Sequence, residues 1–479
     1  MRMRKGLVAA MESEQPALPV NDTDELVDPN VGDPLVESKK PEVIEFPEGA
    51  ETAETEFLEA AKTEGEVAAL EEQIEEGLDA NSALDQLAQT VERANENGGL
   101  DPVAADLLNQ ALEHLYDRVG IPTRANGGVQ HVPSLESFGG TSSRIDAGQI
   151  ALEDIKENMR RIGSAVAKTL RVLIEKVRAY ITQLLDATER NKARIEKTRA
   201  AVENYAPTNN VTTVENARVA SQLSVGTSVP TNLAQALSEV EKLGNYIFNG
   251  NLAMTTEVGK KYLALLKLAP NLEFDVLMTR VGELAPDMIK LAAENQSPLV
   301  QDVTIADGLT TGYSPVLLGN KRFVSVFPSE MDDPQAFTRN IAKTRLSIET
   351  VEGGAPAELK VLNSQQMKQV LDVVGKITDN VLSFRAKQKA IDDLKLQLAA
   401  ATQGLDAALQ KATDGTQSML YQALASGVTA AATLLDAGPR EFTKYAGQTV
   451  KAALDLIELS MKADREKAGE GEQRQIAAA

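Results

Sequence analysis

The net negative charge of this chain lies entirely in its first 136 residues. They contain 9 Lys and Arg against 30 Asp and Glu, a formal charge of -21, whereas residues 137–479 contain 40 basic and 40 acidic residues. Residues 13–50 also hold six prolines, a composition that buries too little apolar surface to offset the entropy of ordering. We therefore expect a disordered acidic leader over 1–50 and an acidic helical segment over 51–136.

Helical patterns dominate from Glu51 onward. We expect short acidic helices, the last from Pro102 to Tyr116 with Asp101 as its N-cap. Pro, Gly, Ser and Thr gather over 119–149 and predict a linker. Apolar residues then recur every three or four positions from Leu152 to Leu184, which predicts a long amphipathic helix that ends near Asn204, within a unit spanning 137–207.

The rest of the chain divides into three expected units. Residues 208–302 read as a loop and helices, and 303–363 as a small β subdomain of two hairpins with turns at 319–321 and 352–356. Residues 364–479 read as a helical bundle, in which a helix capped by Asn363 or Ser364 runs toward Ala400 and later breaks fall at Gly404, Gly415 and Gly438–Pro439. The predicted fold class is mainly α: a partly disordered acidic leader, then long amphipathic helices in a bundle with a small β-hairpin subdomain.

Residue types exclude several kinds of chemistry. The chain has no Cys, and its two histidines, His114 and His131, both precede residue 137, so later residues cannot form Ser-His or Cys-His pairs or histidine-ligated metal sites. No phosphate-binding loop, dinucleotide fingerprint or nucleophile elbow is found. We expect no catalytic residue, cofactor, metal or small-molecule substrate, although Ser/Lys or carboxylate chemistry stays open.

One face of the long helix is basic. Its candidate contacts with an anionic surface, either DNA or a membrane, are Arg160, Arg161, Lys168, Arg171, Arg190, Lys192 and Arg194. The alternative is that these residues form an ordinary solvated helix face.

The predicted linker carries Ser134-Leu135-Glu136 followed by Ser137, at the boundary where the charge changes. An acidic leader, this site and a basic amphipathic helix together resemble the internal head proteins of giant tailed phages of the phiKZ type, chiefly over Ser134 to Gly140 and Ile150 to Val202. In that family prohead proteases cut after Glu in small-residue-x-Glu sites, so the resemblance implies cleavage between Glu136 and Ser137. The pattern also occurs at other positions, for example those ending in Glu12, Glu51, Glu113, Glu153 and Glu349.

The resemblance implies a structural virion protein. It would be made in the host cytoplasm, packed in the prohead core with residues 1–136 as a propeptide, matured by the prohead protease and retained in the capsid interior. The implied partners are that protease, capsid and core proteins and, as a candidate, genomic DNA, with ejection into the host left open. A membrane-active, pore-forming-like helical protein is the main alternative. A head-carried enzyme inhibited by its propeptide is the second.

Overall fold

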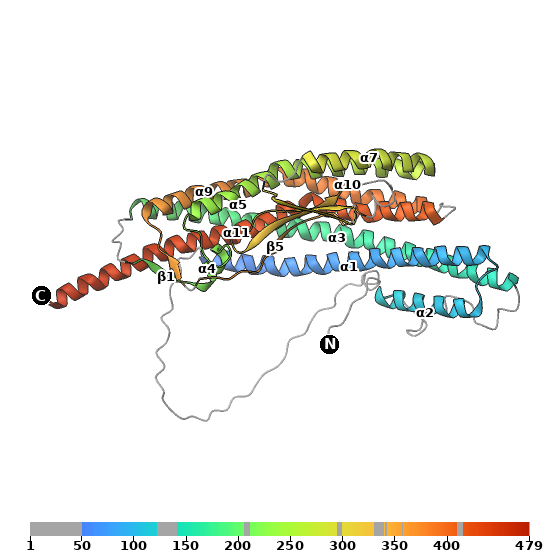
Figure 1. The fold of residues 1–479 in the computed structure, drawn as a ribbon, viewed down its shortest axis with the longest axis horizontal. Helices are drawn as coiled ribbons and strands as arrows, with labels where there is room; N and C mark the ends of the chain where they lie inside the picture. The colour runs from blue at the N-terminus through green and yellow to red at the C-terminus, as the bar shows by residue number, and fades with distance from the viewer. Residues whose placement is uncertain are drawn as a thin grey trace, which may run out of the picture.

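The computed structural model describes residues 50–121, 141–205, 211–294, 299–329, 340, 343–356, 358–409 and 415–478. The leader over 1–49 and the cleavage site Ser134–Ser137 lie outside the described residues. Within them the fold is mainly α, as predicted, with a small antiparallel sheet. The long helices run side by side along one axis and form an elongated bundle (Figure 1).

The leader contributes two helices, and they pack on the bundle. They are α1 (Ala50–Glu96) and α2 (Pro102–Arg118). The expected short helices before Asp101 are instead one 47-residue helix, because no proline interrupts the run and Ala, Leu and Glu are strong helix formers. The start of α2 is as predicted: the Ala104 N–H donates to the Asp101 carboxylate at 2.8 Å, and Pro102 occupies the first turn.

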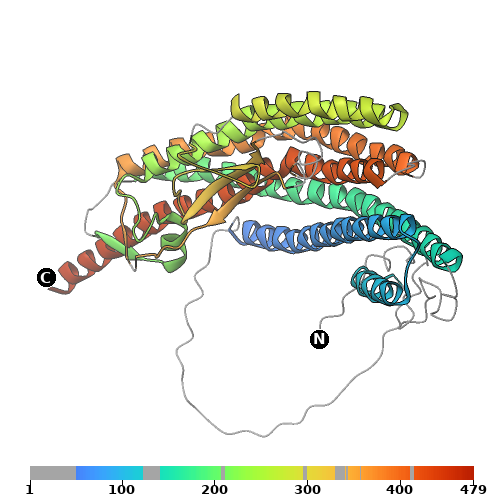
Figure 2. The same ribbon diagram turned by 45° about the vertical axis from the view of Figure 1, so that its right-hand side comes forward.

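The long amphipathic helix is α3 (Thr141–Glu203). It ends where its sequence predicts but is already helical at Thr141, so the expected linker over 119–149 is wrong for its last nine residues. Ala147 and Ala151 are buried there, so packing stabilises helix in a Gly- and Ser-containing segment. Figure 2 shows α1 lying along α3, with α2 folded back at one end of the pair.

Short elements follow α3. They are β1 (Thr213–Glu215), α4 (Ala217–Leu223), α5 (Leu233–Asn245), the π-helical turn η4 (Tyr246–Asn251), α6 (Leu252–Leu268), the 3-10 turn η5 (Ala269–Asn271) and α7 (Phe274–Glu294). The helices α5 and α6 are thus one continuous rod, joined through the π-helical turn.

The β section forms a four-stranded antiparallel sheet in the order β2-β3-β4-β5. Its strands are β2 (Asp302–Ala306), β3 (Leu309–Tyr313), β4 (Lys321–Pro328) and β5 (Arg345–Thr350). The prediction of two hairpins is wrong, because β5 pairs with β4, whereas β6 (Glu358–Lys360) pairs with the distant β1. Residues 315–318 add only an isolated bridge between Leu317 and Lys321.

Three helices complete the bundle: α9 (Ser364–Ser383), α10 (Arg385–Leu409) and α11 (Gly415–Ala478). The Asn363 cap is confirmed, with a reciprocal Gln366 contact. The predicted helix toward Ala400 divides at Phe384, a buried ring packed on Phe248.

The breaks predicted at Gly404 and at Gly438–Pro439 are wrong. Gly404 lies inside α10, where an added Cβ would sit 3.2 Å from Pro270, so the glycine permits close packing rather than a stop. Pro439 is buried inside α11, and its neighbours Ala437 and Phe442 pack into the core. This packing offsets the backbone hydrogen bond that the proline removes. The helix therefore stays continuous through both residues.

One main apolar core joins all these parts. Its buried members include Leu84 and Val91 from α1, Ile155 and Leu170 from α3 and Leu454 from α11. A second, smaller cluster joins α1 to α3 through Ala60, Tyr180 and Leu184. The leader helices therefore contribute to the same core as the rest of the chain.

Candidate functional surface: the basic helix and its acidic cover

The seven candidate basic residues of α3 do not form one surface. Arg160, Lys168 and Arg171 are exposed, and at about 100° per residue they fall within an arc of about 80° on one side of the helix. By the same geometry, Lys192 lies on the opposite side of α3 from Arg190.

Several of these cations are held by carboxylates of the same chain. Arg161 pairs with Glu157 one helical turn away at 3.2 Å, and Lys192 Nζ donates to Asp379 at 2.8 Å. Arg190 also has an interaction within the chain. Much of the basic character predicted for this helix is therefore neutralised internally.

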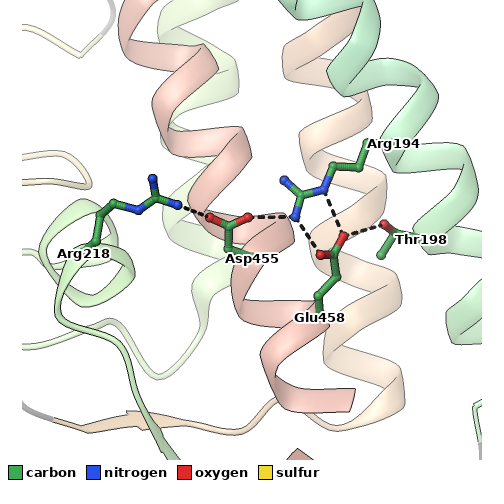
Figure 3. Close-up of polar contacts among 5 residues, drawn as sticks. All are labelled: Arg194, Thr198, Arg218, Asp455 and Glu458. Atoms are coloured by element: carbon green, nitrogen blue, oxygen red, sulfur yellow. Dashed lines mark hydrogen bonds and ion pairs between the residues drawn. The ribbon is translucent and has the colours of Figure 1, made fainter. Parts of the chain in front are cut away.

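Arg194 sits at the centre of an ion-pair network that joins α3, α4 and α11 (Figure 3). Its guanidinium donates to Glu458 at 2.9 and 2.7 Å and to Asp455 at 2.7 Å, while Arg218 approaches the other Asp455 oxygen at 3.0 Å. The Arg194 side chain is only 22% exposed. Burial favours a lower pKa for Arg194, but the hydrogen bonds and charges of Glu458 and Asp455 outweigh it and raise the pKa above its ordinary value. Arg194 thus fastens helices together instead of facing an anionic surface.

The leader lies over another part of the same basic helix. Four ion pairs described in the structure link residues on either side of Glu136, and in each the acid belongs to the leader. Glu66 pairs with Lys176 at 2.7 Å and Glu92 with Lys156 at 3.5 Å, both on α3. Glu71 pairs with Arg440 at 2.8 Å and Glu64 pairs with Lys444, both on α11. The acidic helix is therefore matched in charge to the surface it covers.

The far end of this interface is close-packed. The N–H of Leu100 donates to the carbonyl of Arg144 at 3.2 Å, and a Cβ on Gly99 would lie 2.4 Å from the Arg144 carbonyl carbon. A Cβ on Gly148 of α3 would lie 1.9 Å from the Asn95 side-chain oxygen. Gly99 thus allows the turn after α1 to approach α3 at backbone distance, and Gly148 leaves room on α3 for the Asn95 side chain of α1.

A groove of about 1120 Å³ opens beside the leader. It is lined by α1, α3, α10, α11 and the edge of β5, and among its lining residues are Asp85 and Arg160. Burial raises the pKa of Asp85 to about 6, although hydrogen bonds from Gln89 and Gln422 act in the opposite direction. The groove wall therefore carries a carboxylate that titrates near neutral pH.

A buried ion pair lies deeper in the bundle. Lys395 of α10 donates to Asp436 of α11, and each side chain is only 3% exposed. Arg178 of α3 pairs with the neighbouring Asp392 at 3.3 Å. Burial, as the largest cause, raises the pKa of Asp392, against the lowering effect of Lys395 and Arg178. Each carboxylate has a cation beside it, which is the arrangement expected of a structural network.

In the described part of the chain, no group of three or more His, Asp or Glu side chains could hold a metal ion. None of the helices described is long and apolar enough to cross a membrane.

Comparison with known proteins decides the family. The model of the phiKZ-like phage internal head proteins matches residues 50–459. The chain belongs to this family. No curated protein and no solved structure matches it. As an internal head protein it is a structural component of the virion, located inside the phage capsid with other capsid and core components.

The extent of the match corrects the sequence analysis. The resemblance seen in the sequence ended near Val202, whereas the family match continues through the sheet and into α11. It also includes α1 and α2, so the leader helices are part of what this internal head protein shares with its family. The leader's partners on α3 and α11 were not predicted. Opposite charges on distant helices were the available signal in the sequence, but only the fold shows which of them pair.

Proposed function

We propose that this internal head protein is made as a precursor, packed into the prohead core and cut by the prohead protease between Glu136 and Ser137. Supporting this, the site lies between the last described residue after α2, Ile121, and the first residue of α3, Thr141. Other copies of the pattern are less available, because proteases favour exposed backbone that is not already hydrogen-bonded in a helix or a sheet. Those ending in Glu113, Glu153 and Glu349 lie within α2, α3 and β5.

The cut would separate two segments of opposite electrostatic behaviour. Residues 1–136 carry the formal charge of -21, and residues 137–479 carry none. A head filling with DNA repels the acidic segment and exerts no net repulsion on the neutral body. The charge boundary at the cut carries this proposal.

Mass spectrometry of the protein from purified particles tests the cleavage. We expect a chain that begins at Ser137, and a Glu136→Gln variant that is not cut there. Glu113→Gln is the matched control and should be processed normally. A full-length chain beginning at Met1 in mature particles, or a chain beginning at Thr52 after a cut at Glu51, would contradict cleavage at Glu136.

We also propose that the body is retained with the genome and contacts DNA through the exposed side of α3 formed by Arg160, Lys168 and Arg171. Each phosphate contact releases about one counterion, so removing three contacts lowers the slope of log K against log salt by up to about 3. Arg160→Ala/Lys168→Ala/Arg171→Ala should therefore bind DNA more weakly and with less salt dependence. The control replaces three other exposed lysines by Ala, namely Lys260, Lys267 and Lys389. Equal losses in the two variants would refute this contact surface.

A further inference from the structure

We propose that the leader helices stay bound to the body after the chain is cut at Glu136, as a separate chain seated on α3 and α11. The inference rests on the proposed cleavage, but it concerns the surface that holds the leader. The occupant of that surface is residues 50–121 of this chain.

Apolar contact is the first support. From α1, the side chains of Val67, Ile74, Leu84 and Val91 are buried in the main core, together with Leu108, Leu112 and Tyr116 of α2. Most of these positions in α1 are seven residues apart, which places them on one stripe of the helix. Departure of the leader would expose this stripe and the α3 residues beneath it to water, which is unfavourable.

Charge is the second support. The four described ion pairs across the cut all place an acid on the leader and a base on the body, as set out above. Neither Glu136 nor Ser137 belongs to any of these pairs, so cutting the bond between them removes none of the four. A second copy of the body would bring the same cations to this surface and be repelled. DNA could pair with the cations but would leave the apolar side chains of the body's surface exposed to water. An acidic amphipathic helix satisfies both requirements.

Backbone contact is the third support. The hydrogen bond from Leu100 to Arg144 and the close approach at Gly99 and Gly148 hold the end of α1 against α3. The Tyr116 hydroxyl adds a hydrogen bond to Asp154 of α3 at 3.1 Å. Removal of the leader's charge from the head then needs a second step after the cut, either dissociation or degradation of α1.

The test cuts the full chain without the phage protease. A recognition sequence for a site-specific protease is inserted after Val129, so the result does not depend on whether Glu136 is a natural site. After complete cutting at micromolar concentration in 0.15 M salt, size-exclusion chromatography with intact-mass analysis should show the leader and the body in one peak. Separate elution of the leader and a body that keeps its helical circular dichroism would overturn the proposal.

Charge variants of the same cut protein test the recognition. Neutralising the four paired acids, Glu64, Glu66, Glu71 and Glu92, to Gln should raise the Kd of the leader about tenfold, since exposed pairs contribute modestly and several act together. The control neutralises four exposed acids of the leader, Glu72, Glu75, Glu96 and Asp106, and makes the same change in net charge. Equal effects of the two sets would overturn the charge-matched surface, even if the natural cut at Glu136 is confirmed.

Discussion

The buried carboxyl of Asp85 makes the stability of the precursor depend on pH. Asp85 lies on α1 with its side chain at the groove, and burial raises its pKa from an ordinary 3.8 to about 6. Gln89 donates to one carboxylate oxygen at 2.8 Å and Gln422 of α11 donates to the other at 3.4 Å. Asp85→Asn removes the charge and keeps the shape: the Asn oxygen accepts from one of these amides, and its NH2 group donates to the oxygen of the other once that amide is flipped.

Because its pKa is raised, Asp85 contributes more to the stability of the folded chain at low pH than at high pH. Since the folded chain holds this proton more tightly than the unfolded chain, the contribution of Asp85 to stability is full below pH 3.8 and is lost as pH rises through about 6. A shift of about 2 units corresponds to about 3 kcal/mol at 1.36 kcal/mol per unit, and access of water to the groove reduces this to about 2 kcal/mol. We therefore expect the free energy of unfolding of Asp85→Asn to exceed that of the natural chain by about 2 kcal/mol at pH 7.5. At pH 4 the two free energies should be nearly equal.

Urea unfolding followed by circular dichroism at pH 4, 5, 6, 7, 7.5 and 8 measures this difference. Asp79→Asn is the control, because Asp79 is an exposed carboxylate on the same helix. Its difference from the natural chain should stay constant between pH 5 and 8. If Asp85→Asn is less stable at pH 7.5, or differs by the same amount at every pH, the assignment of a buried, titrating carboxyl is refuted.

Two more substitutions test other parts of the account. Gly99→Ala should destabilise the chain by about 2–4 kcal/mol in urea unfolding, because the φ of +90° at Gly99 disfavours a side chain and the added Cβ meets the Arg144 backbone. The control Gly65→Ala, in open space on α1, should stabilise the chain by about 0.5–1 kcal/mol. Equal effects of the two substitutions would refute the close approach at Gly99. Arg194→Ala should lower the free energy of unfolding by about 2–3 kcal/mol in the same assay, because it leaves Glu458 and Asp455 poorly paired. The control Arg161→Ala, at an exposed ion pair, should change that free energy by less than about 0.5 kcal/mol. A similarly small effect of Arg194→Ala would refute its role in holding α3 against α11.

Local signals predicted the helices whose apolar period or cap lies within one short stretch of sequence. The three- and four-residue apolar spacing of α3 fixed its character and its end, and Asp101 and Asn363 marked the starts of α2 and α9. Asp307-Gly308 is a two-residue hairpin turn with both φ values positive, and it was the overlooked sequence signal for β2 and β3. Pairing of β1 with β6 joins segments far apart in the chain, which no local pattern specifies.

The candidate surface was harder to predict for a related reason. A lysine or arginine on an amphipathic helix looks the same in sequence whether it faces solvent, DNA or a carboxylate of another helix. From sequence, Arg194 and Arg160 therefore had the same candidate role. The position of α11 shows the difference, because Arg194 pairs with Asp455 of that helix whereas Arg160 is exposed. Likewise, a charge of -21 suggested a detachable leader, whereas the fold shows that its helices are built into the core.

The most direct test of maturation is the intact mass of this protein in proheads and in mature particles, measured in the same preparation. The account predicts the full chain in proheads and a body beginning at Ser137 in mature heads. An unprocessed chain beginning at Met1 in mature heads would contradict it.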